Sequence, residues 1–250
     1  MLPLWRNVAR RKNPPPCDRD PAMNIDALAS AGIQFIILLC ALALHEFAHA
    51  WVADRRGDPL PRQQGRVTLD PFAHLDPIGS FLIPGVMIFL PVLLGGGMPV
   101  ALIGWGKPVQ VSLPNAKTRM WDDILTTLAG PGMNLLLALG VTVLGGILLG
   151  LAAPGSLEVV FSRLIFPALF INLVLVVFNL VPLPPLDGSR VMRYVVGMRE
   201  ETFSLLARNS WWVLLVAINI PEFRQVLGTV VLHCAGPFLW LMERIAVLLA

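Results

Sequence analysis

The chain has 250 residues, of which 56% are hydrophobic and only 14% are charged, and its mean hydropathy is +0.70. A typical soluble domain carries about 25% charged residues, so this composition excludes a soluble enzyme and predicts an all-α polytopic membrane protein with about five to six apolar helical segments. The net charge of +3 does not indicate nucleic-acid binding, because the basic residues lie between apolar runs, where membrane topology explains them.

The first 24 residues form a basic segment with three consecutive prolines, which we expect to be a disordered tail or not to be translated. Initiation at Met23 would remove all of its basic residues, which are Arg6, Arg10, Arg11, Lys12 and Arg19. We expect no cleaved signal peptide, because the next apolar stretch lacks a small-residue cleavage site and ends in charged side chains. The predicted organisation is therefore a tail at residues 1–24, a core at residues 25–197 and C-terminal membrane helices at residues 198–250.

The first predicted span, about residues 33–52, contains the sequence His-Glu-Phe-Ala-His at positions 45–49. Residues four apart lie on the same face of a helix, so His45 and His49 can direct their imidazoles at one metal ion. Two neutral imidazoles at this spacing suit Zn²⁺, and Glu46 can then take a proton from a water whose pKa the metal has lowered to about 7. Buried histidines are usually hydrogen-bonded core residues, but three ionisable groups within one turn of an apolar helix indicate a functional site.

A basic loop follows the first span, and the positive-inside rule places it in the cytoplasm. The next, turn-rich stretch contains His74 and Asp76, which could bind a metal but more simply form a cap or an interfacial pair. The apolar run at residues 78–94 is interrupted by Pro84 and Pro91 and is closed by three glycines. Such a broken segment suits a re-entrant hairpin as well as a span. A short extended segment of interfacial character is predicted after it.

Two further apolar runs carry polar groups. Asn134 is an amide within the run at about residues 124–151 and needs a partner there. The run at about residues 164–180 ends in Asn-Leu-Val-Pro-Leu-Pro-Pro-Leu-Asp-Gly, which begins at Asn179 and contains Asp187. Three prolines in four residues cannot continue a helix, and irregular backbone at membrane depth is tolerated only where it is buried or lines a cavity.

The sequence leaves a simpler role open for Asp187, which could cap the basic helix predicted at about residues 189–199. Two more apolar runs follow, at residues 210–220 and 226–249, and they carry no evident chemistry. We expect the last of them to lie in the membrane interface.

Three motifs in this order resemble the site-2 protease family of intramembrane zinc metallopeptidases. They are His-Glu-Phe-Ala-His in the first span, Ala-Gly-Pro-Gly-Met-Asn ending at Asn134, and the proline-rich motif that begins at Asn179. The resemblance covers about residues 25–197 and implies that this core is an intramembrane metalloprotease core. The stretches at 65–79 and 104–109 look like the compact bacterial branch without an inserted PDZ or CBS domain.

Carried over by position, the resemblance implies a ligand set, a base and two polar groups near the cleft that bind substrate. The zinc ligands would be His45, His49 and Asp187, the catalytic base Glu46, and the substrate-binding amides Asn134 and Asn179. The implied reaction is hydrolysis of peptide bonds within or near transmembrane segments of membrane proteins, for which we expect single-span substrates. The protein would use one zinc ion per chain and lie in the cell membrane as a multi-pass protein in contact with lipid. The edge of the extended segment 107–111 would hold the unwound substrate by strand addition.

Two other classes of protein stay open at this point. A membrane zinc carrier or transporter without protease activity would also use intramembrane His and Asp, but it does not need a glutamate beside its ligand. A membrane metallopeptidase of another type would take its third ligand from a downstream glutamate, for which Glu200 and Glu201 are the candidates. These glutamates lie in a polar stretch without a second ligand motif, which favours Asp187.

The ligand set also predicts a topology. All ligands must come within about 2 Å of one ion, so the first span and the run 164–180 should cross the membrane in the same direction. If the basic loop is cytoplasmic, both run inward, and the run 124–151 supplies the outward crossing between them. The segment 78–94 is then predicted to dip into the membrane and return to the cytoplasmic side.

Overall fold

The computed structural model describes residues 25–94, 104–115, 117–153 and 155–250. The predicted tail at residues 1–24 and the triple glycine at 95–97 therefore lie outside the described residues. Within the described ranges the regular structure is helical, which confirms the predicted all-α fold class. Four helical segments there are long and apolar enough to cross a membrane: α2 (Ile25–Arg55), α5 (Arg119–Leu151), α6 to α7 (Glu158–Asn179) and α10 (Pro221–Leu249).

The remaining helices connect or flank these four. They are α3 (Leu60–Gln63), η1 (Pro71–Ala73), η2 (Pro77–Leu82), α4 (Ile83–Leu93), η3 (Phe161–Ile165), α8 (Asp187–Val195) and α9 (Glu200–Asn219), and α7 proper covers Phe166–Asn179.

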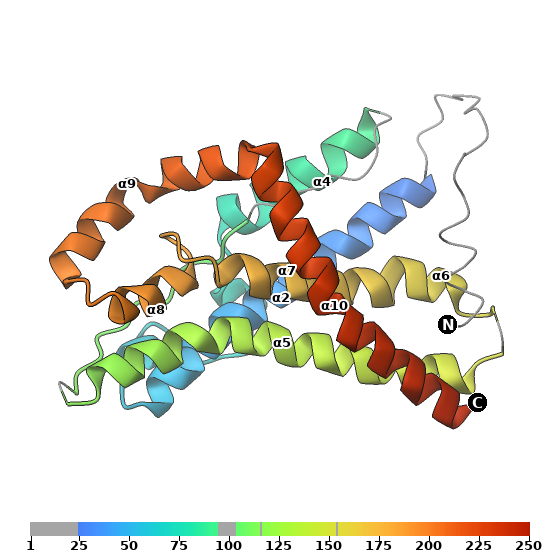
Figure 1. Cartoon of the computed structure of the whole chain (residues 1–250), viewed down its shortest axis with the longest axis horizontal. Coiled ribbons are helices and arrows are strands. Elements are labelled where there is room, and N and C mark those ends of the chain that lie inside the picture. Colours follow the sequence, from blue (N-terminus) through green and yellow to red (C-terminus); the bar gives the residue numbers. More distant parts are fainter. Residues whose placement is uncertain (1–24, 95–103, 116, 154) are drawn as a thin grey trace.

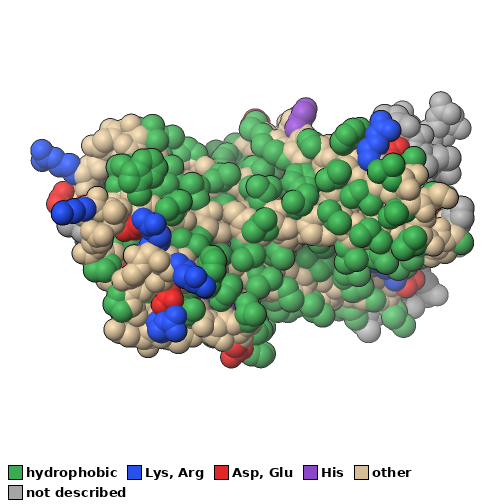
Figure 2. All heavy atoms as spheres, turned by 90° about the horizontal axis from the view of Figure 1, so that it is seen from below, with side chains coloured by type: hydrophobic (Ala, Val, Ile, Leu, Met, Phe, Trp, Pro, Cys, Tyr) green, Lys and Arg blue, Asp and Glu red, His purple; other side chains and the backbone are tan. Residues whose placement is uncertain are grey.

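On the face drawn in Figure 2, most charged side chains lie toward the two ends of the long axis and hydrophobic side chains cover the middle. This distribution is the one expected of a protein whose middle lies in hydrocarbon.

Helices α2, α5 and α7 pack against one another, and α2 and α7 run in the same direction while α5 runs the opposite way (Figure 1). Their apolar sequences bury side chains between them. Leu38 and Leu42 of α2 belong to the same buried cluster as Ile171 and Leu175 of α7. The parallel course of α2 and α7 is the arrangement that the ligand argument predicts.

The described residues on the two sides of the broken apolar segment contact each other. Its helix, α4 (Ile83–Leu93), is short, as expected from its internal proline. Beyond it, the amide of Trp105 donates a hydrogen bond to the carbonyl of Gly79 at 3.1 Å, and Leu75 and Gly106 form an antiparallel bridge. The two flanks of the segment thus lie side by side, as the prediction of a re-entrant segment requires.

The pair His74 and Asp76 has structural roles. Asp76 Oδ1 accepts hydrogen bonds from the amides of Ile78 at 3.0 Å and Gly79 at 2.7 Å, and so caps η2. The Nε2 atom of His74 lies 2.8 Å from the carbonyl oxygen of Thr68. The contacts of Asp76 agree with the predicted capping role, and His74 lies outside the group of residues that could hold a metal in the described structure.

The last helix differs from its prediction. Instead of lying apart in the interface, α10 (Pro221–Leu249) packs across α5 and α7 (Figure 1). The contact is close because α5 presents small residues there. A Cβ atom added to Gly146 would lie 2.8 Å from Cβ of Ile245. The prediction was based on the sequence of this helix alone. The position of α10 is set by how closely its side chains fit against the small residues of α5.

Candidate metal centre

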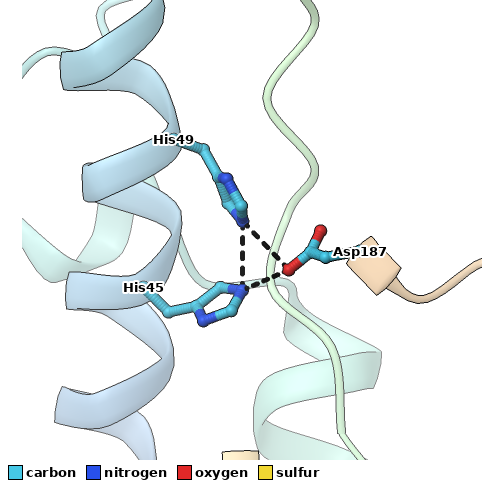
Figure 3. Close-up of side chains that lie close together, drawn as sticks. All are labelled: His45, His49 and Asp187. Atoms are coloured by element: carbon cyan, nitrogen blue, oxygen red, sulfur yellow. Dashed lines mark hydrogen bonds and ion pairs between the residues drawn. The ribbon is translucent and has the colours of Figure 1, made fainter. Parts of the chain in front are cut away.

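Two histidines of α2 and an aspartate at the start of α8 (Asp187–Val195) point toward one another (Figure 3). The Nε2 atoms of His45 and His49 lie 3.1 Å apart. The Oδ2 atom of Asp187 lies 3.2 Å from Nε2 of His45 and 3.4 Å from Nε2 of His49. The three residues predicted as ligands therefore come together from two elements that are far apart in the sequence.

The outer nitrogens of both imidazoles face hydrogen-bond acceptors. Nδ1 of His45 lies 2.6 Å from Oδ1 of Asn134, and Nδ1 of His49 lies 2.7 Å from the carbonyl oxygen of Thr126. A neutral imidazole has only one N–H, so both rings carry it on Nδ1. The lone pairs of both Nε2 atoms then face the carboxylate of Asp187.

This donor set fits a zinc ion. Ligand atoms about 2 Å from zinc at tetrahedral angles lie about 3.3 Å apart, close to the three distances measured here. The residues His45 and His49 are 4% and 9% exposed, and Oδ2 of Asp187 is buried without a hydrogen-bond partner in the described structure. Three acceptor atoms turned toward one another in a buried place repel unless a cation lies between them.

Helix α5 approaches the imidazoles so closely that only glycine fits at position 130. A Cβ atom added to Gly130 would lie 2.3 Å from Nε2 of His49 and 2.5 Å from Nε2 of His45. Four residues further along α5, one turn away, Asn134 contacts His45. The motif Ala-Gly-Pro-Gly-Met-Asn thus supplies both the space beside the imidazoles and one of their hydrogen-bond partners.

The cluster opens into a cavity of about 700 Å³. Glu46 lines this cavity beside the two histidines. The segment after α4 lies against the side chain of Glu46, because a Cβ atom added to Gly106 would be 2.4 Å from Cγ of Glu46. Asn179 also lines the cavity. Asn134 is completely buried and contacts His45, while its predicted role in substrate binding stays a prediction.

Asp187 is the first residue of α8, and contacts between α8 and α5 hold this helix in place. The predicted basic helix 189–199 is observed as Asp187–Val195 with Leu186 at the N-cap position, and Oδ2 of Asp187 has no hydrogen-bond partner in the described structure. This speaks against the simpler role of a cap. Asp123 of α5 binds this helix through Tyr194, whose hydroxyl donates at 2.7 Å, and through Arg190 and Arg193 at 3.3 Å each. Burial, together with the adjacent Asp123 carboxylate, raises the pKa of Tyr194 to about 12.

The competing third ligands lie elsewhere. Glu200 forms an ion pair with Arg193, and Glu201 is exposed. In the described part of the chain, the group of residues whose ligand atoms approach one another closely enough to hold a metal is His45, His49 and Asp187. The arrangement favours Asp187 over either glutamate.

Sequence reasoning missed Asp58, which joins the end of α2 to the extended segment. Its carboxylate accepts hydrogen bonds from the Leu60 amide at 3.0 Å, the Ser112 amide at 2.5 Å, the Ser112 hydroxyl at 2.6 Å and the Leu113 amide at 2.9 Å. Burial raises the pKa of Asp58, but these hydrogen bonds outweigh it and hold the pKa below its usual range. The available signal was its position in Gly-Asp-Pro directly after the first span, which is typical of a turn.

Comparisons with known proteins agree on one family. A model described as "Peptidase family M50" matches residues 144–220. "Putative zinc metalloprotease YwhC" of Bacillus subtilis (strain 168) is 38% identical over 174 residues, which cover 66% of this chain and 71% of the relative. "Putative zinc metalloprotease Rip2" is 30% identical in Mycolicibacterium smegmatis, covering 79% of this chain and 70% of the relative. In Mycobacterium tuberculosis it is 34% identical, covering 73% and 65%. The comparison with solved structures found no significant match.

Proposed function

Because this chain belongs to peptidase family M50 and is an intramembrane zinc metalloprotease, we propose that His45, His49 and Asp187 hold its zinc ion. The observation that carries the proposal is the approach of three lone-pair-bearing atoms to within 3.4 Å of one another at the wall of a cavity. A zinc ion bound there supplies Lewis-acid polarisation of the scissile carbonyl and lowers the pKa of water to about 7.

Glu46 is the proposed general base. It follows His45 directly on α2, and its side chain lines the same cavity. Its carboxylate accepts a proton from the attacking water and later delivers that proton to the amine nitrogen that leaves when the peptide bond breaks. Histidine Nδ1 atoms are already bonded to Asn134 and Thr126, so they are not available for this proton transfer.

The substrates are membrane-embedded proteins, and we propose that they are single-span proteins cut within or near the span. The chemistry of the cavity supports this proposal. Its walls include apolar side chains of α7, α9 and α10, among them Phe170, Val174, Trp211, Leu214 and Val231. An apolar segment of a substrate loses little hydration on entering such a cavity, whereas a charged segment would have to be desolvated.

A substrate helix must unwind before its peptide bond can be reached, and we propose that the extended segment holds the unwound strand. Pro108, Val109 and Val111 line the cavity. Among the described residues, the backbone of 108–111 has no backbone hydrogen-bond partner, so its peptide groups can pair with an added strand. The amide of Asn179, which lines the same cavity, is the second proposed substrate contact.

We further propose that the protein lies in the cell membrane with the loop after α2 in the cytoplasm. Four arginines at the end of α2 and in the chain after it support the orientation by the positive-inside rule; they are Arg55, Arg56, Arg62 and Arg66. The proposed catalytic core is residues 25–197, and residues 198–250 supply helices α9 and α10, which help to enclose the cavity.

Metal analysis of purified variants tests the zinc site. We expect His45→Ala, His49→Ala and Asp187→Ala to lose both bound zinc and proteolysis. The matched controls are Glu200→Ala and Glu201→Ala, which should keep one zinc ion per chain. Full zinc content in Asp187→Ala together with loss of zinc in Glu200→Ala would contradict the proposal and favour a metallopeptidase of another type.

A further inference from the structure

A chain of buried amides connects His45 to the backbone of α7. Oδ1 of Asn134 lies 2.6 Å from Nδ1 of His45. Nδ2 of Asn134 donates to Oδ1 of Asn172 at 3.1 Å, and Nδ2 of Asn172 donates to the carbonyl oxygen of Ala168 at 2.8 Å. The two asparagines are 0% and 4% exposed, so bulk water does not compete for these hydrogen bonds.

The chain of hydrogen bonds has only one direction, because it ends on a backbone carbonyl that can only accept. Asn172 must present its NH₂ group to Ala168, which leaves its oxygen for Asn134. Asn134 must then present its own NH₂ group to Asn172, which leaves its oxygen for His45. The ring proton of His45 is therefore held on Nδ1. A longer contact from Nδ2 of Asn134 to the carbonyl of Ala41, at 3.3 Å, favours the same orientation.

We propose that Asn172 is a positioning residue that acts through Asn134 to hold His45 in the Nδ1–H tautomer, with Nε2 free to bind metal. The proposal rests on the zinc site proposed above. Partners that orient a metal-binding histidine typically change metal affinity or activity by about 10- to 100-fold. Because the Ala41 carbonyl still orients Asn134 when Asn172 is lost, we expect an effect at the lower end of this range.

The second histidine provides an internal reference. His49 bonds through Nδ1 to the backbone carbonyl of Thr126, so its tautomer does not depend on either asparagine. A substitution of Asn172 should therefore change the tautomer of His45 and leave that of His49 unchanged. A general loosening of the fold would affect both rings.

Two substitutions of similar size separate positioning from packing. Leucine in Asn172→Leu can neither accept nor donate, so only the longer contact to the Ala41 carbonyl still orients Asn134, and its amide can turn over in part of the molecules. In Asn172→Asp, a carboxyl oxygen accepts from Asn134 whether the group is ionised or protonated, so the orientation of Asn134 is kept. The matched control is Asn219→Leu, since the Asn219 amide makes the same type of bond to its own helix, at 2.7 Å to the Leu215 carbonyl, and is exposed.

The experiment records histidine ring ¹⁵N spectra of the zinc-free protein and measures the zinc dissociation constant by competition with a chelator. For Asn172→Leu we expect a mixture of tautomers at His45 and about tenfold weaker zinc binding. Asn172→Asp and Asn219→Leu should keep a single Nδ1–H tautomer and bind zinc within about threefold of the wild type. In an Asn134→Leu background, Asn172→Leu should have no further effect on either measurement.

The inference would be overturned if the Asn172→Leu protein kept a single Nδ1–H tautomer at His45. It would also be overturned if Asn172→Leu and Asn172→Asp weakened zinc binding to the same extent. The zinc site is tested separately by His45→Ala. Zinc retained by His45→Ala overturns the zinc site and this inference together, whereas zinc lost by His45→Ala but unaffected by Asn172→Leu overturns the inference alone.

Discussion

The Oδ2 atom of Asp187 lies 3.2 Å from Nε2 of His45, although the two residues belong to helices that are separated in the chain by α5 and α7. They meet because α2 and α7 run in the same direction (Figure 1) and because the backbone unwinds between Asn179 and α8. The site consequently depends on the packing of α2 against α5 and α7 as well as on the ligands themselves.

Glu46→Gln should abolish proteolysis and leave the zinc content unchanged. The carboxylate is the proposed base, and the histidines and Asp187 are the proposed ligands, so an isosteric amide removes proton transfer but no ligand. General-base catalysis contributes about 10²- to 10⁴-fold, so the rate should fall by at least about 10²-fold. The measurements are zinc per chain and cleavage of a model membrane substrate.

His45→Ala is the contrast for this experiment, because it should lose zinc and activity together. A Glu46→Gln protein purified without zinc, beside a wild type that holds one ion per chain, would show that the roles are assigned wrongly. A Glu46→Gln protein with full proteolytic activity would remove Glu46 from the mechanism.

Gly130→Ala should lose zinc, whereas Gly132→Ala should keep it. The new methyl group at position 130 would lie 2.3 Å from Nε2 of His49, while nothing lies within 4 Å of the one at position 132. Both substitutions add the same group to the same helix, where alanine is favoured over glycine by up to about 1 kcal/mol. Zinc content and thermal stability measured on both proteins check the prediction. Equal zinc content in the two variants would contradict the close approach of α5 to the imidazoles.

Much of this fold could be predicted from the sequence because its signals are local. Long apolar runs mark α2, α5, α7 and α10, since hydrocarbon leaves few other structures for them. The spacing of His45 and His49 within one helical turn likewise needs no knowledge of the tertiary fold. The position of α10 was predicted wrongly, because the packing of α10 depends on small residues of α5 that lie against this helix.

The candidate site was predictable only in part, for the same reason. Asp187 was found through a motif resemblance and not through spacing, because nothing local relates it to α2. Asn172 was missed, although it is one of only two polar residues in the apolar run 164–180. The principle that singled out Asn134, that a buried amide in a membrane helix needs a partner, applied to Asn172 equally. Its contact with Asn134 joins two helices and therefore appears only in the fold.

Asp58→Asn should destabilise the protein at neutral pH and raise KM without loss of zinc. The carboxylate holds Ser112 and Leu113, next to the segment that lines the cavity. Hydrogen bonds to a charged group contribute about 1.5 to 3 kcal/mol to stability. We therefore expect the free energy of unfolding of Asp58→Asn to be about 2 kcal/mol lower than that of the wild type. Thermal unfolding and substrate kinetics on the purified protein measure the two effects.

The pH dependence of this difference has a definite sign. The folded-state pKa of Asp58 lies below its usual value, which is about 3.9 in an unfolded chain. Its stabilising contribution is therefore complete above about pH 5 and is lost as the pH falls through the folded-state pKa. The gap in unfolding temperature between wild type and Asp58→Asn should close on acidification below about pH 4. Asp54→Asn, which removes a carboxylate paired with the exposed Arg62, is the control and should change stability less.

Cysteine labelling should place both flanks of α4 on one side of the membrane and the loop after α5 on the other. Lys107 and Lys117 are exposed on the chain between α4 and α5, and Ser156 is exposed in the loop between α5 and α7. Because Trp105 is hydrogen-bonded to Gly79, the chain after α4 lies at the level where the segment began. α5 then carries the chain to the opposite side.

The test uses single cysteines at these three positions in a chain whose native cysteines, Cys17, Cys40 and Cys234, are replaced by serine. An impermeant reagent applied to intact cells should label Ser156→Cys alone, and the same reagent applied to inverted membrane vesicles should label Lys107→Cys and Lys117→Cys. This expected result follows from the positive-inside rule for the loop after α2 and from one outward crossing by α5. Labelling of Lys107→Cys and Ser156→Cys from the same side would mean that α4 and its continuation cross the membrane. In that case α2 and α7 could no longer both run inward, and Asp187 would reach the histidines only if the metal site lay near the middle of the membrane.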